Sequence, residues 1–305
     1  MATSDVLSFT KIPTVDDGIE SFEFHEYEPV ARTILNSAGE IRIHIEQQDL
    51  LTLSSEAYLL FKGRLLKLDG TSYVNVDVVT LTNNGIMHLF SQVSYQLSNQ
   101  EVESVYYPGQ AATMLGMLKY PNVFQLAQRL NQLWYKDSST KTVDNPGKSD
   151  TEAIFRNSAA AAGKVNLHKI SLFVPHEITS DVKRVNLYKS IESKVTLPVF
   201  FRTRQCGTIT VPQSTTFSWR LSVKISPEKP RYIIVGFQTN KDGNQEVNSS
   251  IFDHCDLKNM CIMLNQERYP AVNYNLSFLN HQFPEAYKDA SVFSEKFYGM
   301  NDLIT

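Results

Sequence analysis

Histidine side chains can bind metal ions and transfer protons near neutral pH. They are therefore the first candidates for chemistry in this 305-residue chain. The seven histidines stand singly along the sequence: His25, His44, His88, His168, His176, His254 and His281. A cupin-type metal site needs two histidines one residue apart on a strand, so that both side chains share a face, with a carboxylate and a third histidine nearby. No His-x-His pair occurs, and His44 falls on the polar side of its run beside Arg42 and Glu46. The histidine spacing therefore predicts solvated or structural roles.

The segment "DHCDLKNMC" is the nearest approach to a metal cluster, with His254, Cys255 and Cys261. Zinc sites usually take cysteines in C-x2–4-C pairs, whereas here five residues separate the two cysteines and there is no second pair. Cys261 alternates with Met263 in an apolar run, where a thiol normally behaves as a small buried hydrophobic group. Together with Cys206 the cysteines are odd in number and too few to cross-link a secreted fold of this size, so we expect them to be reduced. The sequence predicts no metal and no cofactor.

Signatures of nucleophilic or phosphate chemistry are also missing from the sequence. It holds neither G-x-S-x-G nor a cysteine with a recognisable partner, and "FKGRLLKLDGT" lacks the G-K-[ST] of a phosphate loop. Carboxylates such as Asp16, Asp17, Glu101 and Glu103 stand in a polar arm or at alternate strand positions, where solvation is the ordinary state. We therefore predict no catalytic residue, no cofactor-binding residue and no enzyme activity.

Surface recognition stays open as a second class of function. Aromatic side chains in exposed loops are common anchors of interfaces, although they also fill β-sandwich cores. The tyrosines that could serve this purpose are Tyr106, Tyr107, Tyr232, Tyr269, Tyr274, Tyr287 and Tyr298. They allow an alternative hypothesis, a non-viral β-sandwich binding module that recognises a carbohydrate or protein partner.

The charge balance limits the classes of partner that the protein is expected to bind. Lys and Arg number 29 and Asp and Glu 32, a formal net charge of −3. That balance argues against affinity gained by neutralising phosphates, so no direct sequence-specific nucleic-acid binding is expected. No stretch reaches the roughly 18 apolar residues of a membrane span, and the first residues lack a signal-peptide pattern. We expect a protein of the cytoplasm or nucleus that is not secreted.

Alternating apolar residues predict strands through the first half of the chain. The runs are "IRIHIEQ", "AYLLFKGRLLKL", "SYVNVDVVTLT", "IMHLFSQVSYQL" and "EVESVYY". Ser98-Asn99 is the expected tip of a hairpin between the last two, and Pro108-Gly109 ends the pairing. Between 110 and 136 the spacing becomes helical, with one apolar stripe formed by Leu126, Leu130, Leu133 and Trp134.

The second half returns to strand patterns after a polar stretch, 137–164, that contains Pro146-Gly147. Its runs are "KISLFVP", "LPVFFRTRQC", "GTITVP", "FSWRLSVKI", "RYIIVGFQT" and "LKNMCIMLNQERYPA", of which 217–225 alternates most clearly. Strands do not alternate regularly with helices, which disfavours a parallel α/β fold. The predicted class is all-β, two tandem β-sandwiches with a short helical excursion in the first.

Several of these runs resemble a family of double jelly-roll proteins found in invertebrate genomes and in Polinton-like or adintovirus-like elements. The family is similar in architecture to the major capsid proteins of the adenovirus and Polinton lineage. The resemblance runs in order from Ile41 to Gly299 through "NNGIMHLFSQVSYQLSNQEVE", "PRYIIVGFQT", "LNQERYPA" and "AYKDASVFSEKFYG". The matching residues are Asn83, Asn84, His88, Phe90, Tyr95 and Glu101, then Arg268, Tyr269, Pro270, Tyr298 and Gly299, and none is catalytic in that family.

The resemblance implies two tandem jelly rolls and a structural role. The expected organisation is an N-terminal arm at 1–20, a first jelly roll at 21–137, a linker at 138–164 and a second jelly roll at 165–305. Family members usually continue beyond the tyrosine-glycine motif, so the second jelly roll is expected to be incomplete at its C-terminus or completed by another chain. The implied function is a major capsid protein-like subunit. It would self-associate as a pseudo-hexameric homotrimer with capsid neighbours, in a virion if the gene is viral.

Overall fold

The computed structural model describes residues 19–31, 35–45, 51–120, 131–134, 154–196, 202–221, 230–241 and 243–299. The chain forms two compact units. The first unit comprises Met1–Leu65 and Val165–Phe201, and the second comprises Leu66–Lys164 and Arg202–Thr305. Each unit thus combines segments from both sides of the polar stretch at 137–164.

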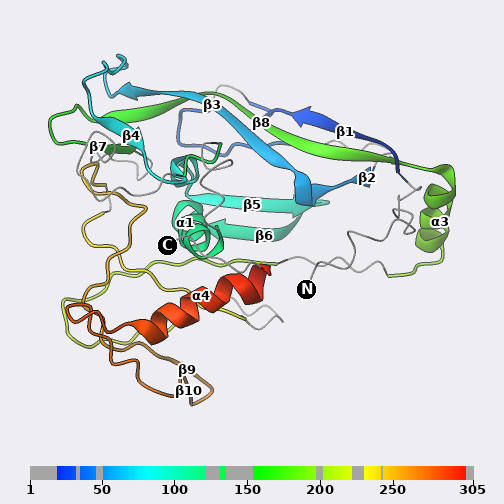
Figure 1. Cartoon of the computed structure of the whole chain (residues 1–305). Helices are drawn as coiled ribbons and strands as arrows, with labels where there is room; N and C mark the ends of the chain where they lie inside the picture. The colour runs from blue at the N-terminus through cyan, green and yellow to red at the C-terminus, as the bar shows by residue number, and fades with distance from the viewer. Residues whose placement is uncertain are drawn as a thin grey trace, which may run out of the picture. The chain divides into compact units, whose positions relative to one another are not determined.

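A four-stranded sheet forms the first unit, with the 17-residue strand β8 (Gly163–Thr179) at its centre (Figure 1). The antiparallel strand β1 (Ile19–Tyr27) pairs with β8 from Ile19↔Thr179 to Tyr27↔Leu172, with one irregularity between Ile19 and Ser21. Strands β2 (Leu51–Thr52) and β3 (Tyr58–Lys67) also pair with β8. The strands predicted at 57–68 and 169–175 are therefore confirmed, and β8 extends further in both directions.

The strand β8 belongs to this sheet although its residues fall almost wholly within the expected second jelly roll. All three of its partner strands come from the expected first jelly roll. Most of the expected linker, 138–153, lies outside the described residues. The tandem arrangement and its boundaries stay predictions.

Proline explains why β2 ends at Thr52. Leu51 and Thr52 pair with Glu177 and His176, and the Leu53 amide then donates to the Pro175 carbonyl over 3.0 Å. Proline has no N–H to give back, so the ladder cannot continue in the regular way past this position. The chain turns instead into the short 3-10 helix η2 (Ser54–Glu56).

Glycine allows β3 to approach β8 closely. A Cβ atom on Gly63 would lie 2.7 Å from the Asn166 carbonyl oxygen, too close for any other residue without a backbone shift. The neighbouring Asn36 side chain accepts from the Leu167 amide over 2.7 Å and donates to the Leu167 carbonyl over 2.8 Å. These contacts cover the start of β8, where Leu167 and Ile170 are buried.

A helix that the sequence analysis missed follows β8. Helix α3 (Asp181–Glu192) buries none of its residues, and its apolar side chains lack the single stripe that marks an amphipathic helix. Asp181 lies in the first turn, where a carboxylate favours the helix dipole, and it binds Arg184 over 2.5 Å. Local interactions of this kind leave little periodic signal in the sequence.

Three strand pairs belong to the second unit. They are β4 (Val79–Leu81) with β7 (Ile154–Arg156), β5 (Gln92–Leu97) with β6 (Gln100–Tyr106), and β9 (Ile262–Leu264) with β10 (Glu267–Tyr269). The predicted hairpin tip between β5 and β6 is confirmed, with φ of 48° at Ser98 and 63° at Asn99. Two positive φ angles are what a tight two-residue turn requires, and here serine and asparagine supply them without glycine.

Two further helices contact each other in this unit. Helix α1 (Pro108–Lys119) begins with proline at its first position, and helix α4 (Pro284–Tyr298) ends at Gly299 with φ 69°. The predicted helix at 110–136 is only partly right. Leu133 and Trp134 lie in a turn, and Leu126 and Leu130 are outside the described residues. A short 3-10 helix, η3 (Gly85–Leu89), packs beside α1.

Several predicted strands are not strands in the described residues. Residues 217–221 form no ladder, although the Phe217 and Trp219 rings stack 5.9 Å apart as strand alternation requires, and 222–225 lie outside the description. The runs at 41–47 and 231–239 show single bridges, Ile43 to Pro29 and Phe237 to Asp253. Phe217 and Trp219 share a face as the pattern predicts, but Trp219 and Leu221, expected to face inward, are each 38% exposed. A strand also needs a backbone partner. The described fold is strand-rich with few helices.

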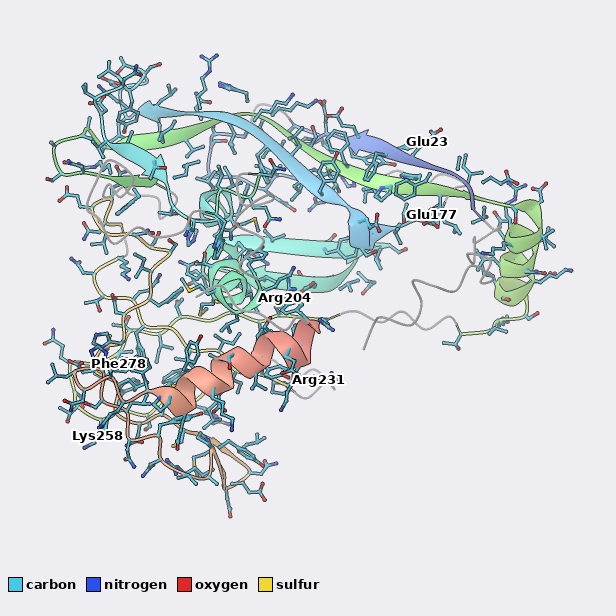
Figure 2. All side chains as sticks on the ribbon, in the orientation of Figure 1. Glu23, Glu177, Arg204, Arg231, Lys258 and Phe278 are labelled. Carbon is cyan, nitrogen blue, oxygen red and sulfur yellow. The ribbon has the colours of Figure 1, made fainter. Side chains whose placement is uncertain are left out.

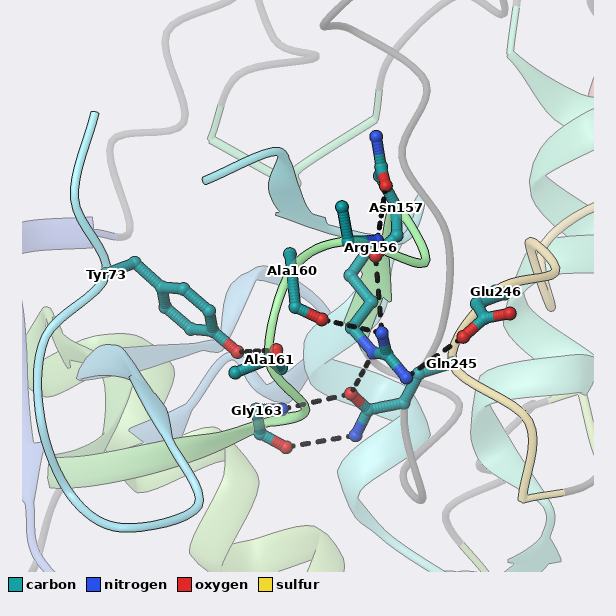
Figure 3. A network of polar contacts seen from close by, with 9 residues as sticks. Tyr73, Arg156, Asn157, Ala160, Ala161, Gly163, Gln245 and Glu246 are labelled. Atoms are coloured by element: carbon teal, nitrogen blue, oxygen red, sulfur yellow. Dashed lines mark hydrogen bonds and ion pairs between the residues drawn. The ribbon is translucent and has the colours of Figure 1, made fainter. Parts of the chain in front are cut away.

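A polar network joins distant segments of the second unit (Figure 3). The buried Gln245 amide accepts from the Gly163 N–H over 3.0 Å and donates to the Gly163 carbonyl over 3.1 Å, as a neighbouring strand would. Its oxygen also accepts from Arg156 Nε over 3.2 Å. Arg156 further binds the Ala160 carbonyl over 2.6 Å and the Glu246 carboxylate over 3.1 Å. This network fixes the loop that leads into β8.

We predict that Gln245→Leu lowers the free energy of unfolding by about 2 to 3 kcal/mol, because it removes three hydrogen bonds of a buried side chain, two to the Gly163 backbone and one from Arg156. Chemical denaturation monitored by circular dichroism measures the change. The matched control is Gln92→Leu, which removes an exposed hydrogen bond to Ser104. It should cost less than about 0.5 kcal/mol. Equal losses in both variants would contradict a special role for the network.

Candidate functional site

The most distinctive surface of the first unit is a row of aromatic side chains on one face of the sheet, which we call the aromatic strip: Phe22, Phe24, Tyr58 and Phe173. The Phe22 and Phe24 rings meet edge to face at 5.4 Å, and Tyr58 stacks on Phe173 at 5.0 Å. Phe24 and Tyr58 lie 5.6 Å apart and join the two pairs. Phe22, Phe24 and Tyr58 are each between 43% and 49% exposed. An exposed row of this kind across three strands is typical of a surface that another molecule covers.

Charged side chains flank the aromatic strip on the same face. Lys169 Nζ lies 2.5 Å from Glu26 Oε1 and 3.0 Å from Glu28 Oε1. The hydrogen bond from Lys169 lowers the pKa of Glu26, and the one to Glu26 raises the pKa of Lys169. The lowered pKa favours the charged form of Glu26 beside the aromatic rings. The surface is therefore apolar with a charged border, as the patches at protein interfaces are.

The opposite face of β1 and β8 brings two histidines together. The His25 and His176 rings lie 4.2 Å apart, and His176 Nε2 is 2.9 Å from the Tyr27 hydroxyl. His176 is 1% exposed, and its Nδ1 atom has no hydrogen-bond partner in the described structure. Burial, and then the nearby His25, lower the pKa of His176. A neutral imidazole is favoured because the His176 ring is buried and its Nδ1 atom has no partner among the described residues that would stabilise a second proton. Only the antiparallel register, which the sequence does not state, makes these residues neighbours.

This histidine pair lacks the further ligands of a metal site. In the residues that the structure describes, no group of three or more histidine, cysteine, aspartate or glutamate side chains is placed to hold a metal. The carboxylate of Glu23 lies beside the pair, with Oε2 4.0 Å from His25 Nε2. The arrangement supports a structural pair.

The segment around His254, the nearest approach to a metal cluster in the sequence, is exposed, and the contacts of His254 are local. His254 Nδ1 accepts from the Asp256 amide over 3.0 Å, and its ring stacks on Phe278 at 4.5 Å. Cys255 and Cys261 are both exposed, so the prediction that Cys261 is buried is wrong. The β9–β10 pair is too small to bury its outer residues, which include Met263 at 62% exposure. Cys206 is half-buried, and burial raises the pKa of its thiol.

The tyrosines of the binding-module hypothesis have mixed surroundings. Tyr232 packs edge to face on Phe293 at 4.8 Å, and Tyr274 donates to Asp289 Oδ2 over 2.7 Å, which raises its pKa to about 12. Tyr298 lies under the Lys119 ammonium, 5.2 Å from the ring centre. Five of the tyrosines are between 41% and 51% exposed: Tyr106, Tyr107, Tyr232, Tyr269 and Tyr287. The contacts of Tyr232, Tyr274 and Tyr298 show that part of the set packs within the second unit.

A shallow hollow in the first unit has a volume of about 100 Å³ and is lined by residues that include Pro29, Leu35 and Ile170. Pockets that enclose organic ligands typically measure about 300 to 1,000 Å³. No helix in the described part of the chain combines the length and apolarity of a bilayer span. The aromatic strip is therefore the feature of the first unit best suited to recognition.

Comparison with known families gives one match. The profile of the double jelly roll-like domain family covers residues 143–304, more than half of the chain. No curated protein and no solved structure matches. The chain belongs to the double jelly roll-like domain family. Its fold is thus a double jelly roll-like one, and the expected resemblance is confirmed at this level.

We predict that the free energy of unfolding falls as the pH falls below about 6.5, the ordinary pKa of histidine in the unfolded chain. Burial and the nearby His25 lower the pKa of His176 in the folded protein, so the unfolded state binds more protons at this residue and gains up to about 1.4 kcal/mol per pH unit. Denaturant titrations between pH 7.5 and 5 measure this slope.

Replacement of His176 by leucine removes this titration, so the slope of the free energy against pH should become smaller. The control is His44→Gln at an exposed position, which should keep the slope of the parent protein. A slope unchanged in His176→Leu would show that other groups control the acid response.

Proposed function

We propose that this protein is a structural subunit of a capsid-type shell, similar to the major capsid proteins of Polinton-like and adintovirus-like elements. The observation that carries the proposal is the aromatic strip on a sheet of a double jelly roll-like protein. The rings of Phe22, Phe24 and Tyr58 are 43% to 49% exposed. Contact with a neighbouring subunit would remove this apolar surface from water, which is favourable. Such a subunit works by presenting surfaces and has no catalytic role.

The proposed assembly is a homotrimer. Two sandwiches in each chain and three chains in a closed ring give a tile with six lobes, which can meet six neighbours. The net charge of −3 suits contacts between proteins better than direct binding of a genome. Its place would be the virion in a viral setting, and otherwise the cytoplasm or nucleus of a host cell.

We predict that the purified chain forms particles of three times its mass of 34.6 kDa at micromolar concentration. Mass photometry measures the mass, and negative-stain electron microscopy should show tiles with pseudo-six-fold outlines. A monomer across that concentration range would contradict the proposal.

The alternative, a binding module for a carbohydrate or protein partner, draws on the exposed tyrosines. Tyr107 and Tyr269 are 42% and 50% exposed, and an exposed tyrosine offers both an apolar ring and a hydroxyl group to a ligand. A glycan array with clear binding by a monomeric protein would favour this module over a shell subunit.

A further inference from the structure

Strand β1 borders the sheet of the first unit (Figure 1). Among the described residues, the only strand that pairs with β1 is β8, along one of its two edges. A strand at the border of a sheet presents backbone donors and acceptors that favour pairing with another strand. The outer edge of residues 21–26 is therefore a candidate surface for strand addition.

Natural proteins usually protect such an edge, and residues 21–26 of β1 carry two glutamates but no lysine, no proline and no bulge. Lysine, proline or a β-bulge in the middle of the strand would discourage pairing. Residues 21–26 read Ser-Phe-Glu-Phe-His-Glu, and the irregularity of register lies at the start of the strand, between Ile19 and Ser21. Phe22 and Phe24 stand 43% and 46% exposed on this strand. The edge is regular and apolar enough to accept a partner.

The charge pattern of β1 is complementary to itself. On the face opposite the aromatic strip, Glu23 and His25 alternate along the strand, and their side chains are 68% and 31% exposed. The side chain of Glu23 is shown in Figure 2. Two antiparallel copies centred on one residue place each position opposite its mirror position. Centred on Phe24, the pairing sets Glu23 opposite the partner's His25, and His25 opposite the partner's Glu23.

We propose that β1 pairs antiparallel with β1 of a second copy of this chain, with Phe24 opposite the partner's Phe24. The two-fold axis then passes through Phe24, and the two sheets continue into one. Opposed aromatic rings and opposed Glu–His pairs are both favourable across antiparallel strands. Centring on Glu23 instead would oppose two glutamates directly, which is unfavourable. The charge pattern therefore favours the register centred on Phe24 over the one centred on Glu23.

This joint rests on the proposed function, because it supplies a contact between shell subunits. A two-fold contact uses the same surface on both copies and cannot by itself close a ring of three. The joint would thus link chains of neighbouring trimers. It names the partner of the outer edge of β1 as another copy of the same chain.

Disulfide trapping tests the register. In a background with Cys206→Ser, Cys255→Ser and Cys261→Ser, the variant Phe24→Cys places two thiols opposite each other. Opposed residues of antiparallel strands have Cα atoms about 4.5 to 5.5 Å apart, within the range of a disulfide. Mild oxidation should give a covalent dimer on a non-reducing denaturing gel.

The matched control is Phe22→Cys in the same background. In the proposed register its two copies are four residues apart along the strands, about 13 Å, so no disulfide should form. The double variant Phe22→Cys with Glu26→Cys restores opposed thiols and should cross-link. Failure of Phe24→Cys to cross-link, or equal cross-linking by Phe22→Cys alone, would overturn the proposal.

Charge exchange tests the Glu–His pairs in the Phe24→Cys background. His25→Glu opposes two carboxylates at two places and should reduce the yield of dimer about tenfold. Adding Glu23→His restores both pairs in exchanged positions and should recover the yield. Thermal unfolding verifies that each variant is folded. A folded double variant that does not recover would rule out these pairs, and the cysteine variants test the register independently of this exchange.

Mass photometry under reducing conditions separates this joint from the proposed function. Trimers without cross-linking of Phe24→Cys would remove the joint and leave the trimer. Cross-linked dimers of a chain that never forms trimers would support the joint and remove the trimer.

Discussion

Backbone pairing by β8 is the interaction on which the sheet of the first unit depends. Buried backbone groups must be paired within the protein, and this long strand meets that need with three partner strands from separate parts of the chain. Its register also decides what the two faces carry. One face receives the aromatic strip and the Lys169 cluster, whereas the other receives the two histidines. A shift by one residue would exchange these faces.

The second unit depends on a different kind of contact. Its three strand pairs are short, and helices α1 and α4 and the network around Arg156 provide contacts between segments distant in sequence. The aromatic rings of α4 supply much of its apolar contact, with Phe293 5% exposed and stacked on Phe297 at 5.0 Å. In both units, single elements cannot cover their own apolar side chains and must pack against other elements. The first unit does so with a sheet, and the second with short strand pairs and helices.

The sequence predicted local features better than it predicted which segments contact each other. It placed β3, the hairpin between β5 and β6 and the centre of β8, because alternation and turn residues are local signals. It missed α3, which has no apolar stripe, and α4, whose residues it had treated as a loose motif.

It also could not show which strands meet. The pairing of His25 with His176 and the aromatic strip arise from residues about 150 positions apart, beyond the reach of periodicity. The burial expected of Cys261 failed for the same reason, because alternation gives a face and does not say what covers it.

The amide of Gln245 acts on Gly163 across 82 residues of chain. On a ribosome, Gly163 emerges well before Gln245, and at about 5 to 20 residues per second the delay is several seconds or more. During that interval the loop before β8 has not received its final hydrogen-bond partner. The hydrogen bonds between Gln245 and Gly163 therefore form only late in translation. Nascent chains are exposed to chaperones and to one another until then.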